Sequence, residues 1–205
     1  MIKLFPIVAG TAVLGLTNVA AAPLSNILNE MESENTVELV EEIKEEVVAK
    51  QTRWVCNSCT ENEKVTLDFF QDYGIKDKYA LATLMGNIKQ ESMFVPNICE
   101  GGARVSYHRC YGGGYGLIQW TTYGRYHGLG HHATITGGDP SSLKTQLSYL
   151  VTEREWKSSE HKFKNPGQSI GYYMNGAYRW LGWGIHGNRT HYSNQYVNRL
   201  TQLSV

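Results

Sequence analysis

Apolar residues recur at the spacing of one helix face in the second quarter of the chain, and a carboxylate shares that face. The spacing predicts an amphipathic helix over about residues 78–92, whose apolar face contains Leu81, Leu84, Met85 and Ile88. Glu91 lies three residues after the last of these, so the helix directs it toward the interior. Burial and the negative end of the helix dipole both disfavour an ionised carboxyl. A neutral carboxyl can act as a general acid, whereas a Glu91 beyond the helix end would instead lie in water, paired with Lys89.

Further helices follow the same periodicity and are separated by glycine-rich turns. They are predicted at about residues 61–73, 141–156, 167–178 and 188–203. Residues 97–116 contain a pair and a triplet of glycines and are predicted to form a loop or small hairpin, followed by a strand or short helix at residues 117–121. These elements predict a mostly α (α+β) single domain over residues 56–205.

The N-terminal segment has the order of a secretory signal. Lys3 precedes an apolar stretch, and small residues follow up to Ala22, with cleavage expected after Ala21. We therefore expect residues 1–22 to be a signal peptide, or a membrane anchor that is later released, and the rest of the chain to be exported to the periplasm or the extracellular space. No stable membrane span is expected after processing.

An acidic stretch separates this leader from the domain. Residues 30–50 contain eight glutamates and two lysines, and we expect residues 23–55 to form a solvated helical linker. The formal net charge of zero therefore leaves a mildly basic body, which suits an anionic polymer such as a bacterial cell wall. The absence of clustered Lys and Arg argues against nucleic acid as a partner.

Four cysteines in an exported chain favour disulfides, for which three pairings are possible. Cys99 with Cys110 is the preferred pair, because it would close a glycine-rich loop with little core of its own. Cys56 and Cys59 would then pair locally or with that loop. A thioredoxin-like redox centre is the alternative for this C-x-x-C, but the βαβ context that it needs is not evident.

A second informative segment runs from residue 112 to residue 122. Its glycines allow close approach of the backbone to a ligand, Tyr115 and Trp120 have flat faces, and Gln119 has both a donor and an acceptor. A sugar polymer needs such groups. The same residues are also typical of a turn that leads into a core strand.

Two motifs taken together are more specific. The sequence Gly-Asn-Ile-Lys-Gln-Glu-Ser at residues 86–92, followed by Gly-Tyr-Gly-Leu-Ile-Gln-Trp at residues 114–120, resembles the phage tail lysozyme family. This family is part of the lysozyme-like group, with soluble lytic transglycosylases and goose-type lysozymes. The resemblance implies a lysozyme-like fold with Glu91 as the catalytic acid and Ser92 as its support. It further implies that the glycan is contacted by Tyr115, Gly116, Gln119 and Trp120, and by Tyr172 and Asn175 near the C-terminus.

The implied activity is cleavage of the glycan strand of peptidoglycan, with Glu91 protonating the glycosidic oxygen. The enzyme would be a muramidase if a second carboxylate assists, and Glu100 is the preferred candidate over Asp139. It would be a lytic transglycosylase if the hydroxyl of the substrate itself attacks. No cofactor is expected, and other virion proteins are further partners that the resemblance implies.

Two rival functions compete with this interpretation. His127, His131 and His132 could bind zinc in a wall peptidase, but the glycines among them argue against the rigid helix of an H-E-x-x-H site and favour a surface loop. A wall-binding or structural virion protein without turnover would explain the aromatic residues and the basic body equally well. A buried acid argues against it, because a binding protein has no need for one.

Overall fold

A computed structural model of the chain describes Val37 and residues 53–111 and 113–203. The predicted signal segment and nearly all of the predicted acidic linker lie outside the described residues. The chain divides into two units, and the second, residues 50–205, contains all of the described residues except Val37.

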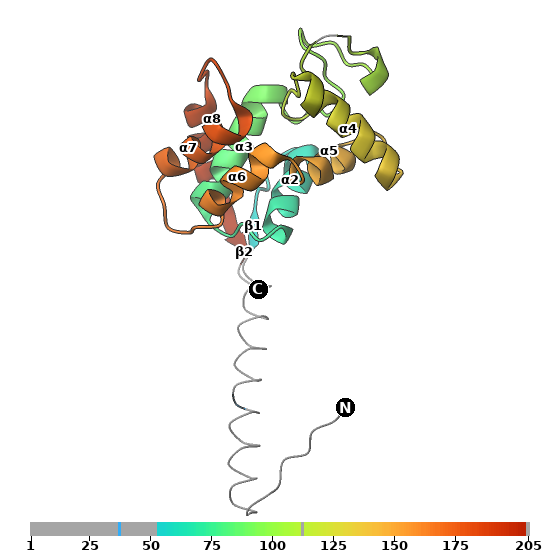
Figure 1. The fold of residues 1–205 in the computed structure, drawn as a ribbon. Helices are drawn as coiled ribbons and strands as arrows, with labels where there is room; N and C mark the ends of the chain where they lie inside the picture. Colours follow the sequence, from blue (N-terminus) through green and yellow to red (C-terminus); the bar gives the residue numbers. More distant parts are fainter. Residues whose placement is uncertain (1–36, 38–52, 112, 204–205) are drawn as a thin grey trace, which may run out of the picture. The chain divides into compact units, whose positions relative to one another are not determined.

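Helices dominate the described part of this unit, which confirms the mostly α fold class (Figure 1). The helices are α2 (Glu61–Asp72), α3 (Lys78–Ser92), α4 (Tyr123–Thr136), α5 (Leu143–Leu150), α6 (Arg154–Phe163), α7 (Ile170–Leu181) and α8 (Arg189–Arg199). A short 3-10 helix (Tyr107–Arg109) lies in the loop before α4, and two strands, β1 (Arg53–Val55) and β2 (Thr201–Leu203), form an antiparallel sheet. None of the helices in residues 53–203 is long and apolar enough to span a membrane.

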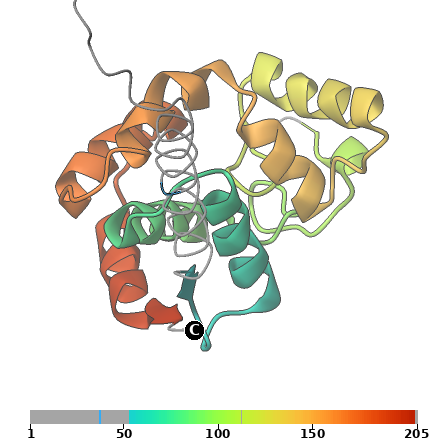
Figure 2. The ribbon, with the colours of Figure 1, turned by 90° about the horizontal axis from the view of Figure 1, so that it is seen from below.

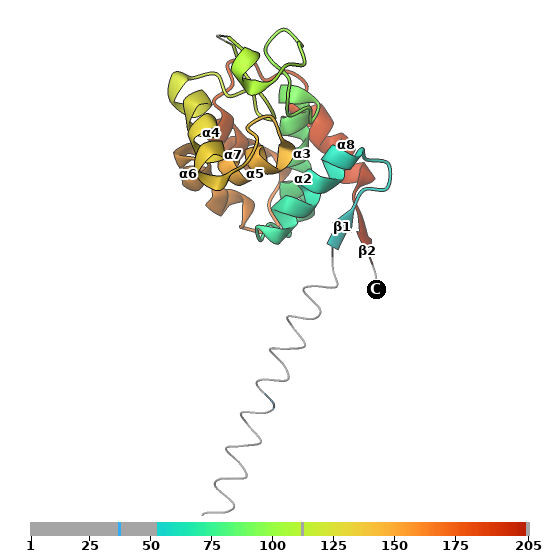
Figure 3. The same ribbon diagram turned by 90° about the vertical axis from the view of Figure 1, so that its right-hand side faces the viewer.

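Helix α3 is the centre of the domain, and α2, α7 and α8 pack around it (Figures 2 and 3). Its bounds agree with the predicted residues 78–92. At the N-terminal end, the Asp77 side chain caps the first turn by accepting a hydrogen bond from Ala80 N. Every residue from 80 to 88 is buried, so α3 is surrounded by protein rather than covered on one face. Gly86 allows this, since a Cβ atom there would lie 2.4 Å from the backbone nitrogen of Ser193 in α8.

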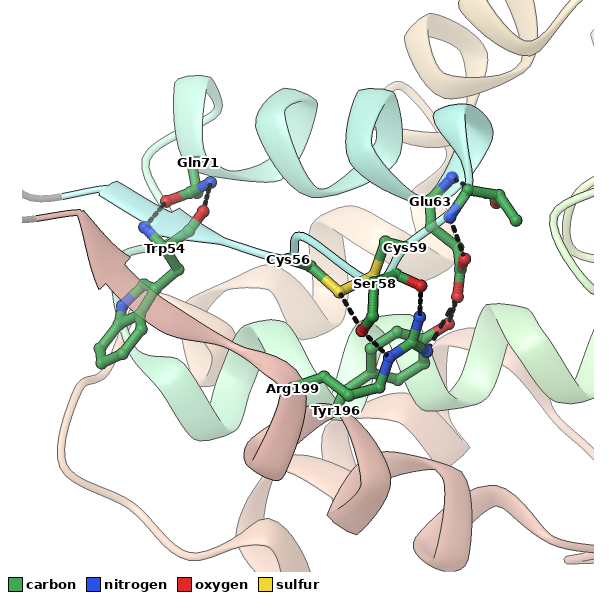
Figure 4. Close-up of a disulfide and its surroundings, with 9 residues drawn as sticks. Trp54, Cys56, Ser58, Cys59, Glu63, Gln71, Tyr196 and Arg199 are labelled. Carbon is green, nitrogen blue, oxygen red and sulfur yellow. Dashed lines mark hydrogen bonds and ion pairs between the residues drawn. A yellow bond between two sulfur atoms is a disulfide. The ribbon is translucent and has the colours of Figure 1, made fainter.

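The sheet joins the two ends of the described segment. Trp54 of β1 pairs with Gln202 of β2, and the Gln71 side chain of α2 bonds both backbone groups of Trp54 (Figure 4). The sequence had placed residues 53–55 in the linker and residues 201–203 in the last helix. That helix instead ends at Arg199, because the backbone of the following residues pairs with β1.

Helix α4 was not expected, because its glycines had indicated a loop. The structure shows why glycine is compatible with a helix here: a Cβ atom at Gly128 would lie 2.2 Å from the Tyr149 hydroxyl, and one at Gly130 would lie 2.6 Å from the Tyr107 hydroxyl. The glycines therefore let two tyrosine rings contact the helix backbone. The prediction of a loop at these residues was wrong.

The single helix predicted over residues 141–156 is in fact two helices. Helix α5 ends at Leu150, and Glu153, whose backbone is extended, precedes the first turn of α6. Arg125 of α4 forms an ion pair with Glu153 at 2.7 Å, which joins this break to the neighbouring helix. Helix α7 begins and ends three residues later than predicted, after the Ser169 cap.

Residues 97–111 and 113–116 form the expected loop, with isolated bridges rather than strands. The prediction of a strand or short helix at residues 117–121 was wrong, because residues 116–119 form a turn that leads back to the bridge between Tyr115 and Trp120. Cys99 bridges to Tyr115, and Tyr115 bridges to Trp120. The disulfide between Cys99 and Cys110 confirms the preferred pairing, and Cys56 pairs locally with Cys59. The latter disulfide lies beside Arg199, which donates hydrogen bonds to Ser58 (Figure 4).

Candidate active site

Glu91 opens onto a cavity of about 570 Å³, which we call the Glu91 cleft. It is the penultimate residue of α3, and its side chain is 15% exposed. Three segments complete the cleft: the loop at Glu100, residues 114–121, and the connection between α7 and α8. A mostly enclosed carboxyl group at the edge of such a cavity can reach a bound ligand while being largely shielded from solvent.

Arg189 at the start of α8 is the partner of Glu91. Its guanidinium forms a short ion pair with the Glu91 carboxylate, and its side chain is 6% exposed. Its second terminal nitrogen, Nη1, donates to the carbonyls of Ile185 (2.8 Å) and His186 (2.9 Å), and the guanidinium lies over the Trp183 ring at 4.6 Å. The sequence predicted an inward-facing Glu91, which the structure shows, but not a charged partner for it.

The residue before Glu91 fixes the same connection. Gln90 accepts a hydrogen bond from the backbone nitrogen of Asn188 at 2.8 Å. Gly187 has a φ of 57°, and a Cβ atom there would lie 2.9 Å from the Gln90 amide carbon. Two consecutive side chains at the end of α3 therefore hold the α7–α8 connection, one through the backbone and one through Arg189.

Ser92 joins α3 to the second motif rather than lining the cleft. It is 2% exposed, and its hydroxyl donates to the Leu117 carbonyl at 2.7 Å. This bond places residues 114–121 next to the end of the helix that carries Glu91. A role for Ser92 in supporting Glu91 or in binding substrate stays a prediction.

Of the four glycan-contacting residues predicted in the second motif, Gln119 lines the cleft. Its backbone has a φ of 54°, a conformation that is uncommon for residues other than glycine. Its side-chain nitrogen donates to the Gly116 carbonyl at 3.0 Å. A strained backbone of this kind persists where surrounding contacts fix it, and here it directs an amide side chain into the cleft.

The other three residues of that motif, Tyr115, Gly116 and Trp120, pack against the protein interior and do not line the cleft. Tyr115 and Trp120 are fully buried, so their rings are core groups and offer no face to a ligand. Gly116 has a φ of 75°, and a Cβ atom there would lie 2.7 Å from the Gln146 side chain. The alternative that the motif leads into the core therefore describes these three residues better than ligand contact does.

Glu100 is the second carboxylate of the cleft among the described residues. Its side chain accepts a hydrogen bond from the Gly114 backbone nitrogen at 3.2 Å, which brings it to the segment that carries Gln119. Asp139, the other candidate, accepts from the backbone nitrogen of Ser141 at 2.8 Å and does not line the cleft. The structure thus brings together Glu91 and Glu100 and leaves Asp139 outside.

The two C-terminal candidates are not brought to the cleft. Tyr172 lies under the Lys162 ammonium group at 4.5 Å and accepts a hydrogen bond from Asn165, while Asn175 is exposed on α7. Only the last residue of α7, Leu181, lines the cleft. The residues that sequence reasoning missed follow directly after it.

Trp183, Ile185 and Arg189 form the cleft wall that was not predicted. Trp183 stands between two glycines, the same combination of glycine and aromatic residue that drew attention to residues 112–120, so a signal for it was present. Arg189 had no signal, because its contact with Glu91 depends on how α8 crosses α3.

The three histidines considered as zinc ligands do not converge. His127 and His131 lie one helical turn apart on one side of α4, whereas His132 bonds to the Ser148 hydroxyl of α5 at 2.9 Å. Among residues 53–111 and 113–203, no group of three or more His, Cys, Asp or Glu side chains could hold a metal ion.

Residues 61–195 match the family model described as phage tail lysozyme, a span that includes Glu91, Gln119 and Arg189. The chain belongs to the phage tail lysozyme family. Membership makes it a lysozyme-like domain whose family acts on peptidoglycan. No curated protein and no solved structure matches the chain. Both strands, at residues 53–55 and 201–203, lie outside the matched span.

Proposed function

We propose that this protein cleaves the glycan strand of peptidoglycan with Glu91 as the general acid. The observation that carries the proposal is the position of Glu91, a largely shielded carboxyl at the edge of a 570 Å³ cleft that also contains Gln119. Membership of a lysozyme family supports peptidoglycan as the substrate. A cavity of this volume can hold sugar units of a strand on either side of the bond that breaks.

In this proposal the protonated Glu91 transfers its proton to the glycosidic oxygen. The bond to the anomeric carbon breaks, its electron pair stays with the leaving sugar, and positive charge develops on the other ring. Glu91 becomes a carboxylate in this step, and Arg189 is placed to stabilise the new negative charge.

The second step decides between a hydrolase and a lytic transglycosylase. Glu100, the other carboxylate of the cleft, would activate a water molecule in the hydrolase. If Glu100 takes no part, a hydroxyl of the sugar itself attacks the anomeric carbon and gives its proton to the Glu91 carboxylate, so an anhydro sugar is formed and Glu91 is protonated again. Mass spectrometry of digested peptidoglycan separates the two, because anhydro products alone would exclude the hydrolase.

The test of Glu91 is a comparison of wild type with Glu91→Gln by zymography on peptidoglycan. We expect Glu91→Gln to lose clearing while still binding to peptidoglycan in a pull-down. Glu160→Gln is a suitable control, since Glu160 lies on α6 and pairs with lysines outside the cleft. Undiminished clearing by Glu91→Gln would remove Glu91 from the mechanism.

A wall-binding protein without turnover is the second candidate. The contact between Glu91 and Arg189 favours it, because a largely buried ion pair can hold the α7–α8 connection in place without taking part in any reaction. Zymography decides here too, since a binding protein gives no clearing with either the wild type or the variant but still sediments with peptidoglycan.

Export is the last part of the proposal. Two disulfides in the described residues support an environment outside the cytoplasm. The signal peptide or releasable anchor at residues 1–22 stays a prediction. Mass spectrometry of the mature N-terminus tests it, and a purified protein from the native source that begins at Met1 would contradict cleavage.

A further inference from the structure

A second cavity, of about 750 Å³, lies between α4 and the loop that precedes it. Figure 1 shows α4 beside this loop at one end of the domain. We call the cavity the tyrosine–histidine pocket, after Tyr107, His108, Tyr111, Tyr123, Tyr126 and His127, which supply its aromatic walls. The proposed mechanism uses none of these residues.

The inner wall of the pocket is rigid. The rings of Tyr107 and Tyr126 stack with centroids 4.3 Å apart. The Tyr107 hydroxyl donates to the Tyr126 carbonyl at 2.8 Å, and the Tyr126 hydroxyl donates to the Tyr107 carbonyl at 2.6 Å. Because each tyrosine is fixed by the other, the wall is formed before a ligand arrives and loses little conformational freedom on binding.

The rim of the pocket exposes large aromatic side chains to solvent. Tyr111 is 89% exposed and Tyr123 is 79% exposed, and the Tyr123 ring lies against His127 with centroids 4.0 Å apart. Exposed aromatic groups that gather around a cavity are typical of a ligand site rather than of ordinary surface.

The pocket and the Glu91 cleft share a lining residue. Thr121 lines both cavities, and the adjacent residues Gly113 and Gly114 line the pocket and the cleft respectively. Because the two cavities meet at Thr121, a polymer long enough to extend beyond the cleft at Glu91 would reach the pocket there.

The chemistry of the walls points to sugar rings. No Asp, Glu, Lys or Arg side chain lines the pocket among the described residues, so it offers no fixed charge to the carboxylates and amines of a stem peptide. Flat aromatic faces suit the apolar face of a pyranose, and imidazole nitrogens and the hydroxyls of Thr121 and Thr134 can bond sugar hydroxyls.

We propose that the tyrosine–histidine pocket binds sugar units of the same glycan strand that is cleaved at Glu91, so that long strands are better substrates than short ones. This inference rests on the proposed function for its substrate. It adds a second binding site, separate from the reacting bond, that selects for strand length.

The test compares wild type, Tyr123→Ala and Tyr79→Ala on peptide-free glycan strands that have been separated by length. Tyr79 is an exposed tyrosine that lines neither cavity, so it is a matched control. We expect Tyr123→Ala to lose about tenfold in kcat/KM on long strands, the scale of one aromatic contact, and to keep wild-type kcat/KM on tetrasaccharides. An equal loss on both lengths, or no loss on either, would overturn the proposal.

Binding measured in the Glu91→Gln background separates this proposal from the proposed catalytic role. Titration of Glu91→Gln and of Glu91→Gln with Tyr123→Ala with long peptide-free strands should show about tenfold weaker binding for the second protein. If Glu91→Gln proves active, kcat/KM of the same two proteins on long and short strands replaces the titration, so the pocket can be supported even when the role of Glu91 fails. If the Tyr123 substitution weakens binding only when stem peptides are present, the pocket binds peptide and the proposal is wrong.

Discussion

Arg189, in the first turn of α8, pairs with Glu91, in the last turn of α3, across 98 positions of sequence. Both side chains are largely removed from water. Pairing offsets the cost of burying each charge, so removal of either side chain leaves an uncompensated charge on the other. The contact also joins the helix that carries the proposed acid to the wall of the cleft formed by the α7–α8 connection.

Removal of Arg189 alone should be more damaging than removal of the whole pair. We expect Arg189→Met to lower the free energy of unfolding by about 3 kcal/mol, because it leaves the Glu91 carboxylate without its partner. The double variant with Glu91→Gln should recover most of this loss. Denaturant unfolding of the wild type, both single variants and the double variant forms a complete cycle, and additive effects would show that the two side chains do not interact.

The effect of the charge of Arg189 can be separated from the effect of its planar guanidinium group by substitution with lysine. Arg189→Lys keeps the positive charge but loses the planar group that lies over Trp183 and bonds two carbonyls of the connection. If Arg189 stabilises the Glu91 carboxylate as the proton is transferred, kcat should fall by about tenfold while KM changes little. A rise in KM at constant kcat would instead assign Arg189 to substrate binding.

The two disulfides should differ in their effect on activity. Cys99–Cys110 spans 11 residues and holds the loop in which Glu100 N donates to the Gly114 carbonyl, whereas Cys56–Cys59 spans 3. Replacement of the first pair by alanine should cost about 2–3 kcal/mol of stability and reduce peptidoglycan clearing, since Glu100 and Gly114, which both line the cleft, would be held less firmly.

The Cys56→Ala and Cys59→Ala double variant is the matched control, and it should retain clearing when assayed well below its unfolding temperature. Clearing that is equally reduced by both replacements would mean that the loop at Glu100 has no special role.

The close crossing of α3 and α8 is also testable. A methyl group at Gly86 would collide with the backbone of Ser193, so Gly86→Ala should lower the free energy of unfolding by about 1–3 kcal/mol. Gly124→Ala is the control, because nothing lies within 4 Å of a Cβ atom there and alanine favours helix; it should be neutral or stabilising by up to about 1 kcal/mol. Thermal unfolding should therefore show a lower unfolding temperature for Gly86→Ala, which reports the packing effect, than for Gly124→Ala, which reports helix propensity.

Local signals explain what could be predicted from this sequence. The bounds of α3, the inward position of Glu91 and the Cys99–Cys110 disulfide follow from periodicity, capping and loop composition, all of which act over a few residues. Helix α4 was missed because the reason for its glycines lies in tyrosines that are distant in sequence. Arg189 was missed for the same reason, since no local pattern indicates which helix crosses the end of α3.

Aromatic residues show the limit of composition as a guide to a binding site. Trp120 and Trp183 both lie next to glycine or close to it in sequence, yet the first is fully buried and the second lines the cleft. Burial depends on packing of the whole domain, here on the rings and helices that close over residues 115–120. An aromatic side chain in a glycine-rich segment thus has the same local sequence pattern whether it lies in the core or lines the cleft.

Stability should also depend on pH through Glu63, which lies beside the Cys56–Cys59 disulfide (Figure 4). Burial acts to raise the pKa of this carboxyl, but hydrogen bonds from Tyr196, from the backbone and side chain of Thr60 and from Arg199 outweigh it, and the pKa is lowered from its usual value of 4.5. An acid with a depressed pKa in the folded state stabilises the fold above its unfolded pKa, and this contribution is lost as pH falls through the folded pKa.

The unfolding temperature should therefore stay level from pH 7 to pH 5 and fall below about pH 4.5, the region in which carboxyl groups titrate. At pH 7, the free energy of unfolding of Glu63→Gln should be lower than that of wild type by about 2 kcal/mol, because Arg199 loses an anionic partner. Near pH 3, the free energies of unfolding of the two proteins should become similar. Glu160, whose pKa is also lowered although burial opposes it, will still contribute to the fall in the variant. A constant difference between the two proteins from pH 7 to pH 3 would show that the ionised state of Glu63 does not stabilise the fold.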